Sequence, residues 1–128
     1  MNHVVDSSAW LEYFAAGPNA AHFREPLKQV DRLIVPTITL FEVFKVVHRQ
    51  RGENAAIQAV ALMKQGREIP LDGSLAMQAA QLSLDLKLPM ADSIILTTAM
   101  AYKAELWTQD DVFEGLAGVR YFPKLSQE

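Results

Sequence analysis

The chain has 128 residues, of which 50% are hydrophobic and 21% are charged, and its net charge is −3. This composition fits one globular domain and excludes intrinsic disorder. The absence of cysteine excludes disulfides and thiolate metal sites. No apolar run is long enough to cross a bilayer and the first residues lack a signal-peptide pattern, so we expect a cytoplasmic protein with no membrane segment. The acidic balance also argues against a protein that merely coats nucleic acid, because phosphate binding favours basic surfaces.

Short apolar runs alternate with helical patterns along the chain. The predicted elements, in order, are strand 3–5, helix 8–16, helix 19–30, strand 32–36, helix 37–51, helix 53–65, strand 67–71, helix 74–87, helix 89–103, strand 105–108, a helical turn over 110–116 and strand 119–122. This alternation predicts an α/β domain with a parallel sheet and helices on both faces. In such sheets, ligands bind beyond the carboxyl ends of the strands, where the strand order reverses.

Acidic residues follow two of the predicted strands. Asp6 comes directly after the first strand, and Asp110 and Asp111 follow the strand 105–108. Asp is common both at helix N-caps and in turns, so each acid has a purely structural explanation. If Asp6 is instead a site residue, Ser7 or Ser8 remains to cap the first helix.

A third acid, Glu42, lies in the segment TLFEVFKVV. The surrounding apolar residues spread over much of a helical wheel, which predicts a helix buried on more than one side. Glu42 shares a narrow polar stripe with Lys45 and Arg49. Such a stripe is either solvated surface with a weak i,i+3 ion pair or the wall of a cleft with the acid at its depth.

A fourth acid, Asp92, lies near the start of the helix that follows Pro89. A negative charge is favoured at this position by the helix dipole, which needs no ligand. The rest of the helix is almost wholly apolar from Ile94 to Ala101, so the acid stands at the entrance of a buried helix and points toward the strand ends.

The joint pattern of the four acids is more informative than any one of them. If they converge, their mutual repulsion raises pKa values unless a cation lies among them. Carboxylate oxygens suit the hard cations Mg²⁺ and Mn²⁺ and do not suit Zn²⁺. A bound cation would also explain how an acidic protein neutralises phosphate, and it is the usual catalyst of phosphodiester hydrolysis.

Three segments carry a family resemblance: VVDSSAWLEYF near the start, PTITLFEVFKV, and LPMADSIILTTAMAYKAELWTQDDVF. In these segments, which together span nearly the whole chain, the sequence resembles the PIN-domain ribonucleases, most closely the VapC-type toxins of bacterial toxin–antitoxin pairs. The resemblance implies one PIN domain over residues 1–128. It also implies a three-layer α/β/α sandwich with a five-stranded parallel sheet in the order 3-2-1-4-5.

Matched by position, the resemblance implies a site of four acids with two supporting hydroxyls. The acids are Asp6, Glu42, Asp92 and Asp110, and the hydroxyls are Ser7 and Thr108. They are expected to hold one or two Mg²⁺ or Mn²⁺ ions, and a metal-activated water then cleaves RNA endonucleolytically, leaving a 5′-phosphate and a 3′-hydroxyl. Asp111 is then left as a helix-start residue.

The same resemblance implies partners. The protein is expected to bind RNA, a cognate VapB-type antitoxin and a second copy of itself. Candidate contacts to the RNA backbone are Lys45, Arg49, Arg51 and Lys103, each of which is otherwise ordinary surface charge. The apolar residues Trp10, Leu11, Tyr13 and Phe14 either contact a partner protein or pack in the core.

Three other interpretations involve similar residues. A phospho-receiver module also places acids and Mg²⁺ at strand ends, and Asp72 after the third strand would be its phosphorylated residue. It would also need a lysine after a late strand, where this chain has WTQDD. A phosphatase of the haloacid-dehalogenase type needs a second Asp two residues after Asp6, where Ser8 stands. A catalytically inactive PIN-like binding protein is the remaining alternative, against which the four acids argue.

Overall fold

The structure is a computed structural model whose described part comprises residues 1–125, so the last three residues of the predicted 1–128 domain lie outside it. The strands are β1 (Asn2–Val5), β2 (Leu33–Pro36), β3 (Arg67–Ile69), β4 (Ala104–Thr108) and β5 (Val119–Tyr121). The α-helices are α1 (Ser7–Phe14), α2 (Ala20–Leu27), α3 (Thr37–Arg51), α4 (Glu53–Met63), α5 (Gly73–Leu86) and α6 (Met90–Ala101), and the short 3₁₀ turns are η1 (Val30–Arg32) and η2 (Asp111–Phe113).

All strand pairs of the sheet are parallel, and the strands lie in the order β3-β2-β1-β4-β5. The predicted fold is therefore confirmed. The order reverses between β1 and β4, which pair directly, with Val5 opposite Trp107. Because both strands run the same way, the residues that follow them meet at one edge of the sheet.

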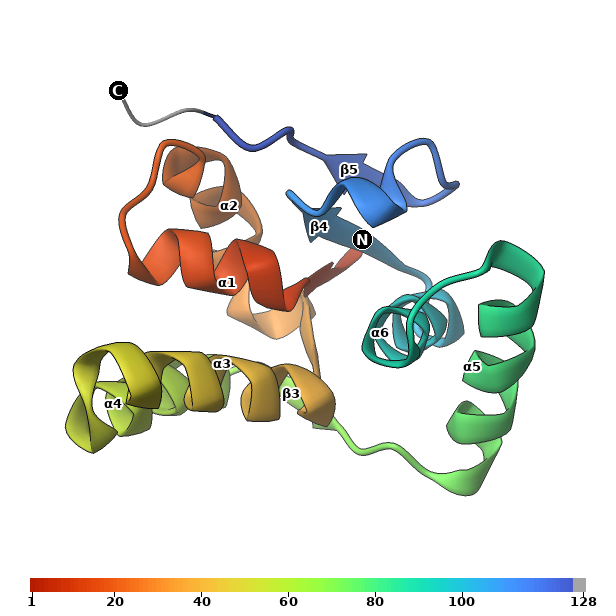
Figure 1. The fold of residues 1–128 in the computed structure, drawn as a ribbon, viewed down its shortest axis with the longest axis horizontal. Helices are drawn as coiled ribbons and strands as arrows, with labels where there is room; N and C mark the ends of the chain where they lie inside the picture. Colours follow the sequence, from red (N-terminus) through yellow and green to blue (C-terminus); the bar gives the residue numbers. More distant parts are fainter. Residues whose placement is uncertain (126–128) are drawn as a thin grey trace.

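The sheet separates two hydrophobic cores, because successive side chains of a strand point to opposite faces. Val5, Val35 and Trp107 pack with α1 to α4 on one face, whereas Val4 and Leu106 pack with α5 and α6 on the other. Figure 1 shows the same division, with α1 to α4 on one side of the strands and α5 and α6 on the other. None of the helices within residues 1–125 combines the length and apolarity needed to cross a membrane.

Helix α3 is less buried than its sequence predicts. Only Thr39, Val43 and Val47 are buried, whereas Phe41 is 65% exposed and Phe44 is 37% exposed. The expectation of a helix buried on more than one side is therefore wrong. Val43 and Val47 pack in one core with residues of α4 and the sheet, and the side of the helix that carries Phe41 and Phe44 faces solvent.

Candidate active site

The two strand-end acids lie at the reversal of the sheet. Asp6 follows β1 directly and is only 3% exposed, and its backbone N–H donates to Trp107 O at 2.9 Å. Asp110 lies two residues beyond the end of β4. Burial raises the pKa of Asp6, hydrogen bonds from Ser8 and Thr108 oppose that shift, and the charge of Asp110 adds to it. The sheet thus brings together two carboxylates that are far apart in sequence.

One oxygen of Asp6 accepts every hydrogen bond that its side chain makes within residues 1–125. Oδ2 accepts from Ser8 Oγ at 2.6 Å, from Thr108 Oγ1 at 3.0 Å and from Ser8 N at 3.3 Å. Asp6 is therefore itself the N-cap of α1, and the expectation that Ser7 or Ser8 caps this helix is wrong. The other oxygen, Oδ1, accepts no hydrogen bond from this part of the chain.

Asp110 repeats this arrangement at the end of β4. Its Oδ1 accepts from Val112 N at 3.1 Å, so it caps η2, and Asp111 is the first residue of that turn, as expected. The Asp110 N–H donates to Thr108 Oγ1 at 2.9 Å. The Thr108 hydroxyl, which is fully buried, thus accepts from Asp110 and donates to Asp6. Thr108 fixes the two acids relative to each other.

Glu42 reaches the same edge of the sheet from α3. Ser7 Oγ donates to Glu42 Oε1 at 2.6 Å, so the first residue of α1 holds the acid in place. Ser7 is 7% exposed, and Glu42 is half-buried. The acid therefore does not stand on a freely solvated stripe, although Lys45 and Arg49 beside it are exposed.

Asp92 lies in the first turn of α6 and is half-buried. Its pKa is raised to about 7, first by burial and then by the charges of three other carboxylates, those of Asp6, Asp110 and Glu42. Such an effect requires that each of the other three acids lies near Asp92. The structure therefore gathers all four sequence-predicted acids at one site.

The chemistry of this cluster suits a hydrated divalent cation. The two ion pairs within residues 1–125 involve none of the four acids, so no basic side chain in that range neutralises them. No three His, Asp or Glu side chains of that range stand close enough to ligate one ion directly. Mg²⁺ typically contacts only one or two carboxylates and keeps several waters, so four oxygen-donor side chains at longer range still match its needs.

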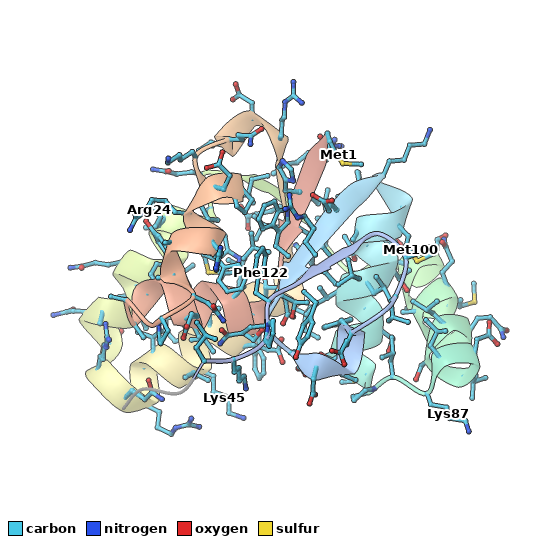
Figure 2. All side chains as sticks on the ribbon, turned by 90° about the horizontal axis from the view of Figure 1, so that it is seen from above. Met1, Arg24, Lys45, Lys87, Met100 and Phe122 are labelled. Atoms are coloured by element: carbon cyan, nitrogen blue, oxygen red, sulfur yellow. The ribbon has the colours of Figure 1, made fainter. Side chains whose placement is uncertain are left out.

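The basic residues predicted to bind RNA do not all lie near the acids. Lys45 lies over the exposed ring of Phe41, 5.7 Å from its centroid, and Arg49 and Arg51 occupy the last turns of α3. Figure 2 shows Met1, next to the start of β1, and Lys45 at opposite sides of the molecule. Lys103 directly precedes β4, so it lies at the amino-terminal edge of the sheet, opposite the acids. Its position gives no support to a contact with RNA at this site.

The residue on which the phospho-receiver reading depends is also remote. Asp72 follows β3, which is an edge strand, and its side chain caps α5 by accepting from Leu75 N at 2.8 Å. A receiver needs its acid at the centre of the sheet, beside the other acids. Asp72 instead has a structural role at the margin.

A family comparison is consistent with this geometry. The profile of the PIN domain matches residues 3–119. The chain belongs to the PIN domain family. A search of curated protein sequences found no match.

Solved structures share the fold of this PIN domain at low sequence identity. A toxin–antitoxin complex from Klebsiella pneumoniae aligns with a TM-score of 0.81 and 22% identity over 97% of this chain and 100% of that chain. VapC20 from Mycobacterium tuberculosis, a toxin that cleaves the sarcin–ricin loop, aligns with a TM-score of 0.75 and 15% identity over 91% and 95%. DNA-bound VapBC from Salmonella typhimurium aligns with a TM-score of 0.75 and 17% identity over 96% and 98%.

Some residues of this PIN domain's site carry no clear signal in the sequence. Ser8 was expected only as a cap, yet its hydroxyl donates to Asp6. Gln109 stands between Thr108 and Asp110, and that position is the only hint of its importance. Asn19 bonds to Gln109 from 90 residues away, and nothing in its own segment predicts this contact.

Proposed function

We propose that this PIN domain is a metal-dependent endoribonuclease that acts as the toxin of a type II toxin–antitoxin pair. The observation that carries the proposal is the cluster of four carboxylates at the reversal of the sheet, where burial and then the charges of the other three raise the pKa of Asp92 to about 7. Unneutralised carboxylates in a half-buried site are costly unless a cation binds there. Membership of the PIN domain family and the fold shared with VapC toxins support the same function.

The proposed roles follow from the contacts of each side chain. Asp6, Glu42, Asp92 and Asp110 would hold one or two Mg²⁺ or Mn²⁺ ions. Ser7 orients Glu42, and Thr108 orients Asp6 while accepting from the Asp110 backbone. When bound, the cation would lower the pKa of the attacking water and offset charge on the phosphate. Water adds to phosphorus, the bond to the 3′ oxygen breaks, and the products are a 5′-phosphate and a 3′-hydroxyl.

The proposed partners are a VapB-type antitoxin and a second copy of the chain, and the proposed compartment is the cytoplasm. The Klebsiella and Salmonella structures are toxin–antitoxin complexes, which supports an antitoxin partner. Of the apolar residues considered as contacts, Trp10 is 2% exposed and belongs to the core, whereas Leu11, Tyr13 and Phe14 are only partly buried. Any partner surface on α1 therefore excludes Trp10.

The test is RNA cleavage by the purified protein in Mg²⁺, in Mn²⁺ and in EDTA, with the cleaved ends mapped. Asp6→Asn and Asp110→Asn are the informative variants, because Asn caps helices about as well as Asp and only the charge is lost. We expect cleavage and growth toxicity to disappear in both, with the fold retained. Full activity in EDTA would rule out the metal mechanism, and toxic Asn variants would show that the site is elsewhere. Asp72→Asn, which changes an acid at the edge strand, is the matched control and should remain active.

A further inference from the structure

A cleft next to the acids has no role in the proposed chemistry so far. It has a volume of about 310 Å³ and lies between α1 and α3, with Gln109 and Lys124 completing its wall. Ser8, which donates to Asp6, lines it on the α1 side. A second hollow of about 280 Å³ contains Asp110 and shares Gln109 and Lys124 with the first. The cleft thus lies next to the site, through Ser8 on one side and through the neighbouring hollow that reaches Asp110 on the other.

The side chain of Gln109 is held in one orientation by a buried residue. Asn19 is 2% exposed, and its Nδ2 donates to Gln109 Oε1 at 3.1 Å and to Pro123 O at 2.9 Å. Both N–H groups of the Asn19 amide are used in this way. Because Oε1 of Gln109 is occupied, its Nε2 is the free end, and within residues 1–125 it donates to no acceptor. Gln109, which is 7% exposed and lines both hollows, therefore has the donor end of its amide unpaired in this part of the chain.

The cleft also carries basic side chains, although the net charge of the whole chain is −3. Arg51 Nη1 donates to Phe14 O at 3.3 Å, which anchors the guanidinium at the cleft and leaves its other N–H groups available. Lys124 borders both hollows. The acid in the wall, Glu12, is engaged, since its Oε2 accepts from Asn19 N at 2.8 Å. Cations beside an amide donor suit a phosphate next to a base.

We propose that this cleft binds the nucleotide adjacent to the cleaved phosphodiester, with Gln109 contacting the base and Arg51 and Lys124 contacting its phosphate. This inference rests on the proposed ribonuclease function. Gln109 Nε2 can only donate, so where it faces C6 of a purine or C4 of a pyrimidine it favours guanine or uracil, which carry a carbonyl oxygen there, over adenine or cytosine, which carry an amino group there. Asn19 is the positioning residue that fixes which end of the Gln109 amide faces the base.

The test is cleavage of a random single-stranded RNA pool, with sequencing of the ends to obtain the base preference at each position around the cut. Gln109→Glu replaces the donor by an acceptor and retains an oxygen for Asn19. We expect the preference at one position beside the cut to move from guanine and uracil toward adenine and cytosine, by about fivefold or more. Asn19→Ala should flatten the same preference, which loss of stability alone would not do.

A second variant keeps the inference testable if the Gln109 variant does not fold. Lys124→Gln changes an exposed side chain and should weaken RNA binding. It should also make the slope of the log binding constant against log salt concentration smaller by about one, because one contact to phosphate is lost. Lys103→Gln, at the opposite edge of the sheet, is the matched control and should change neither quantity.

Three results would overturn the inference. If the wild-type protein and the Gln109→Glu variant cleave RNA with the same base preference, Gln109 does not contact the base. If the Gln109 and Lys124 variants lose only antitoxin binding, the cleft is a binding site for the protein partner and not for RNA. A wild-type protein that cleaves no RNA would overturn the proposed function itself, and this inference with it, which is a different result from an unchanged preference.

Discussion

The Ser7 hydroxyl donates a 2.6 Å hydrogen bond to Oε1 of Glu42, a residue 35 positions away. The bond joins the first residue of α1 to the first half of α3 at the edge of the sheet where Asp6 lies. A carboxylate that accepts a short hydrogen bond from a buried hydroxyl has a defined orientation, and a freely solvated glutamate does not. The site therefore depends on a side chain that itself touches neither substrate nor metal in the proposed mechanism.

Ser7→Ala removes this bond, and we expect RNA cleavage to fall about 10–100-fold, as is typical when a residue that orients a metal ligand is lost. Stability should change little, by about 1 kcal/mol, because half-buried Glu42 regains water. The measurements are cleavage rates and urea midpoints. Ser74→Ala, which removes an exposed serine bonded to Gln78, is the control. An unaltered cleavage rate would mean that Glu42 needs no support from Ser7.

Asp6 both caps α1 and belongs to the acidic cluster, and two substitutions separate these roles. Asp6→Asn keeps an oxygen that accepts from Ser8 N and removes a buried charge, so the free energy of unfolding should stay constant or rise. Asp6→Ala also loses the cap and should be less stable than Asp6→Asn by about 1 kcal/mol. Both should lose cleavage. Urea unfolding decides the point, and equal stability of the two variants would mean that the cap contributes nothing.

His3 links the pH dependence of stability to the strands that carry the site. Trp107 Nε1 donates to His3 Nδ1 at 3.1 Å, and burial lowers the pKa of His3 below 6.5. A lowered pKa means that the unfolded chain binds the proton more tightly. The contribution of His3 to the free energy of unfolding is therefore fully present above pH 6.5, the pKa of His in the unfolded chain. It is lost as the pH falls through the lower pKa that His3 has in the folded protein. His3→Asn keeps an acceptor near Nδ1 and does not titrate, so it should lose less stability between pH 7.5 and 5 than the wild type. Urea unfolding followed by tryptophan fluorescence measures this, and equal losses would contradict it.

Chain order and hydrophobic pattern were enough to predict a parallel sheet with acids beyond two of its strands, whereas the strand order and the set of four acids came from the resemblance to PIN-domain ribonucleases. The strands are short apolar runs, and a parallel sheet sends every residue that follows a strand to one edge, so Asp6 and Asp110 share an edge, and the strand order implied by the resemblance makes them neighbours there. The position of Asp92 follows equally simply from the start of a buried helix.

Features that depend on tertiary contacts could not be predicted in this way. The sequence offers cap and site residue as alternatives for Asp6, but a carboxylate has two oxygens, and Oδ2 alone accepts the hydrogen bonds of the cap. Asn19 bonds to Gln109 and Pro123 across about 100 residues, which no local pattern shows. A helical wheel could not indicate that Phe41 faces solvent, because the wheel does not tell which side of α3 another element covers.

Asp92 gives the chain a pH dependence opposite to that of His3. Its pKa rises from 3.8 to about 7, so the folded protein holds this proton more tightly than the unfolded chain does. The contribution of this group to stability is fully present below pH 3.8 and is lost as the pH rises through about 7. Asp92→Asn mimics the neutral form, so it should be more stable than the wild type at pH 8, by about 1 kcal/mol after allowance for solvent screening, and equally stable near pH 3.8. Thermal melts of both proteins at the two pH values test this, and a less stable variant at pH 8 would contradict it.

The same carboxylate should report cation binding without any RNA present. A cation near Asp92 favours its ionised form, so Mg²⁺ should stabilise the wild type more at pH 8 than at pH 5. At a Mg²⁺ concentration of about 100 times its dissociation constant, binding at pH 8 adds about 2.7 kcal/mol to the free energy of unfolding. Each kcal/mol raises the Tm by about 4 °C. Asp110→Asn, whose cap is intact, should lose most of this rise, whereas Asp72→Asn at the edge strand should keep it. Because ionisation of Asp92 is what the cation promotes, a rise in Tm that is the same at both pH values would show that Mg²⁺ binds elsewhere on the protein.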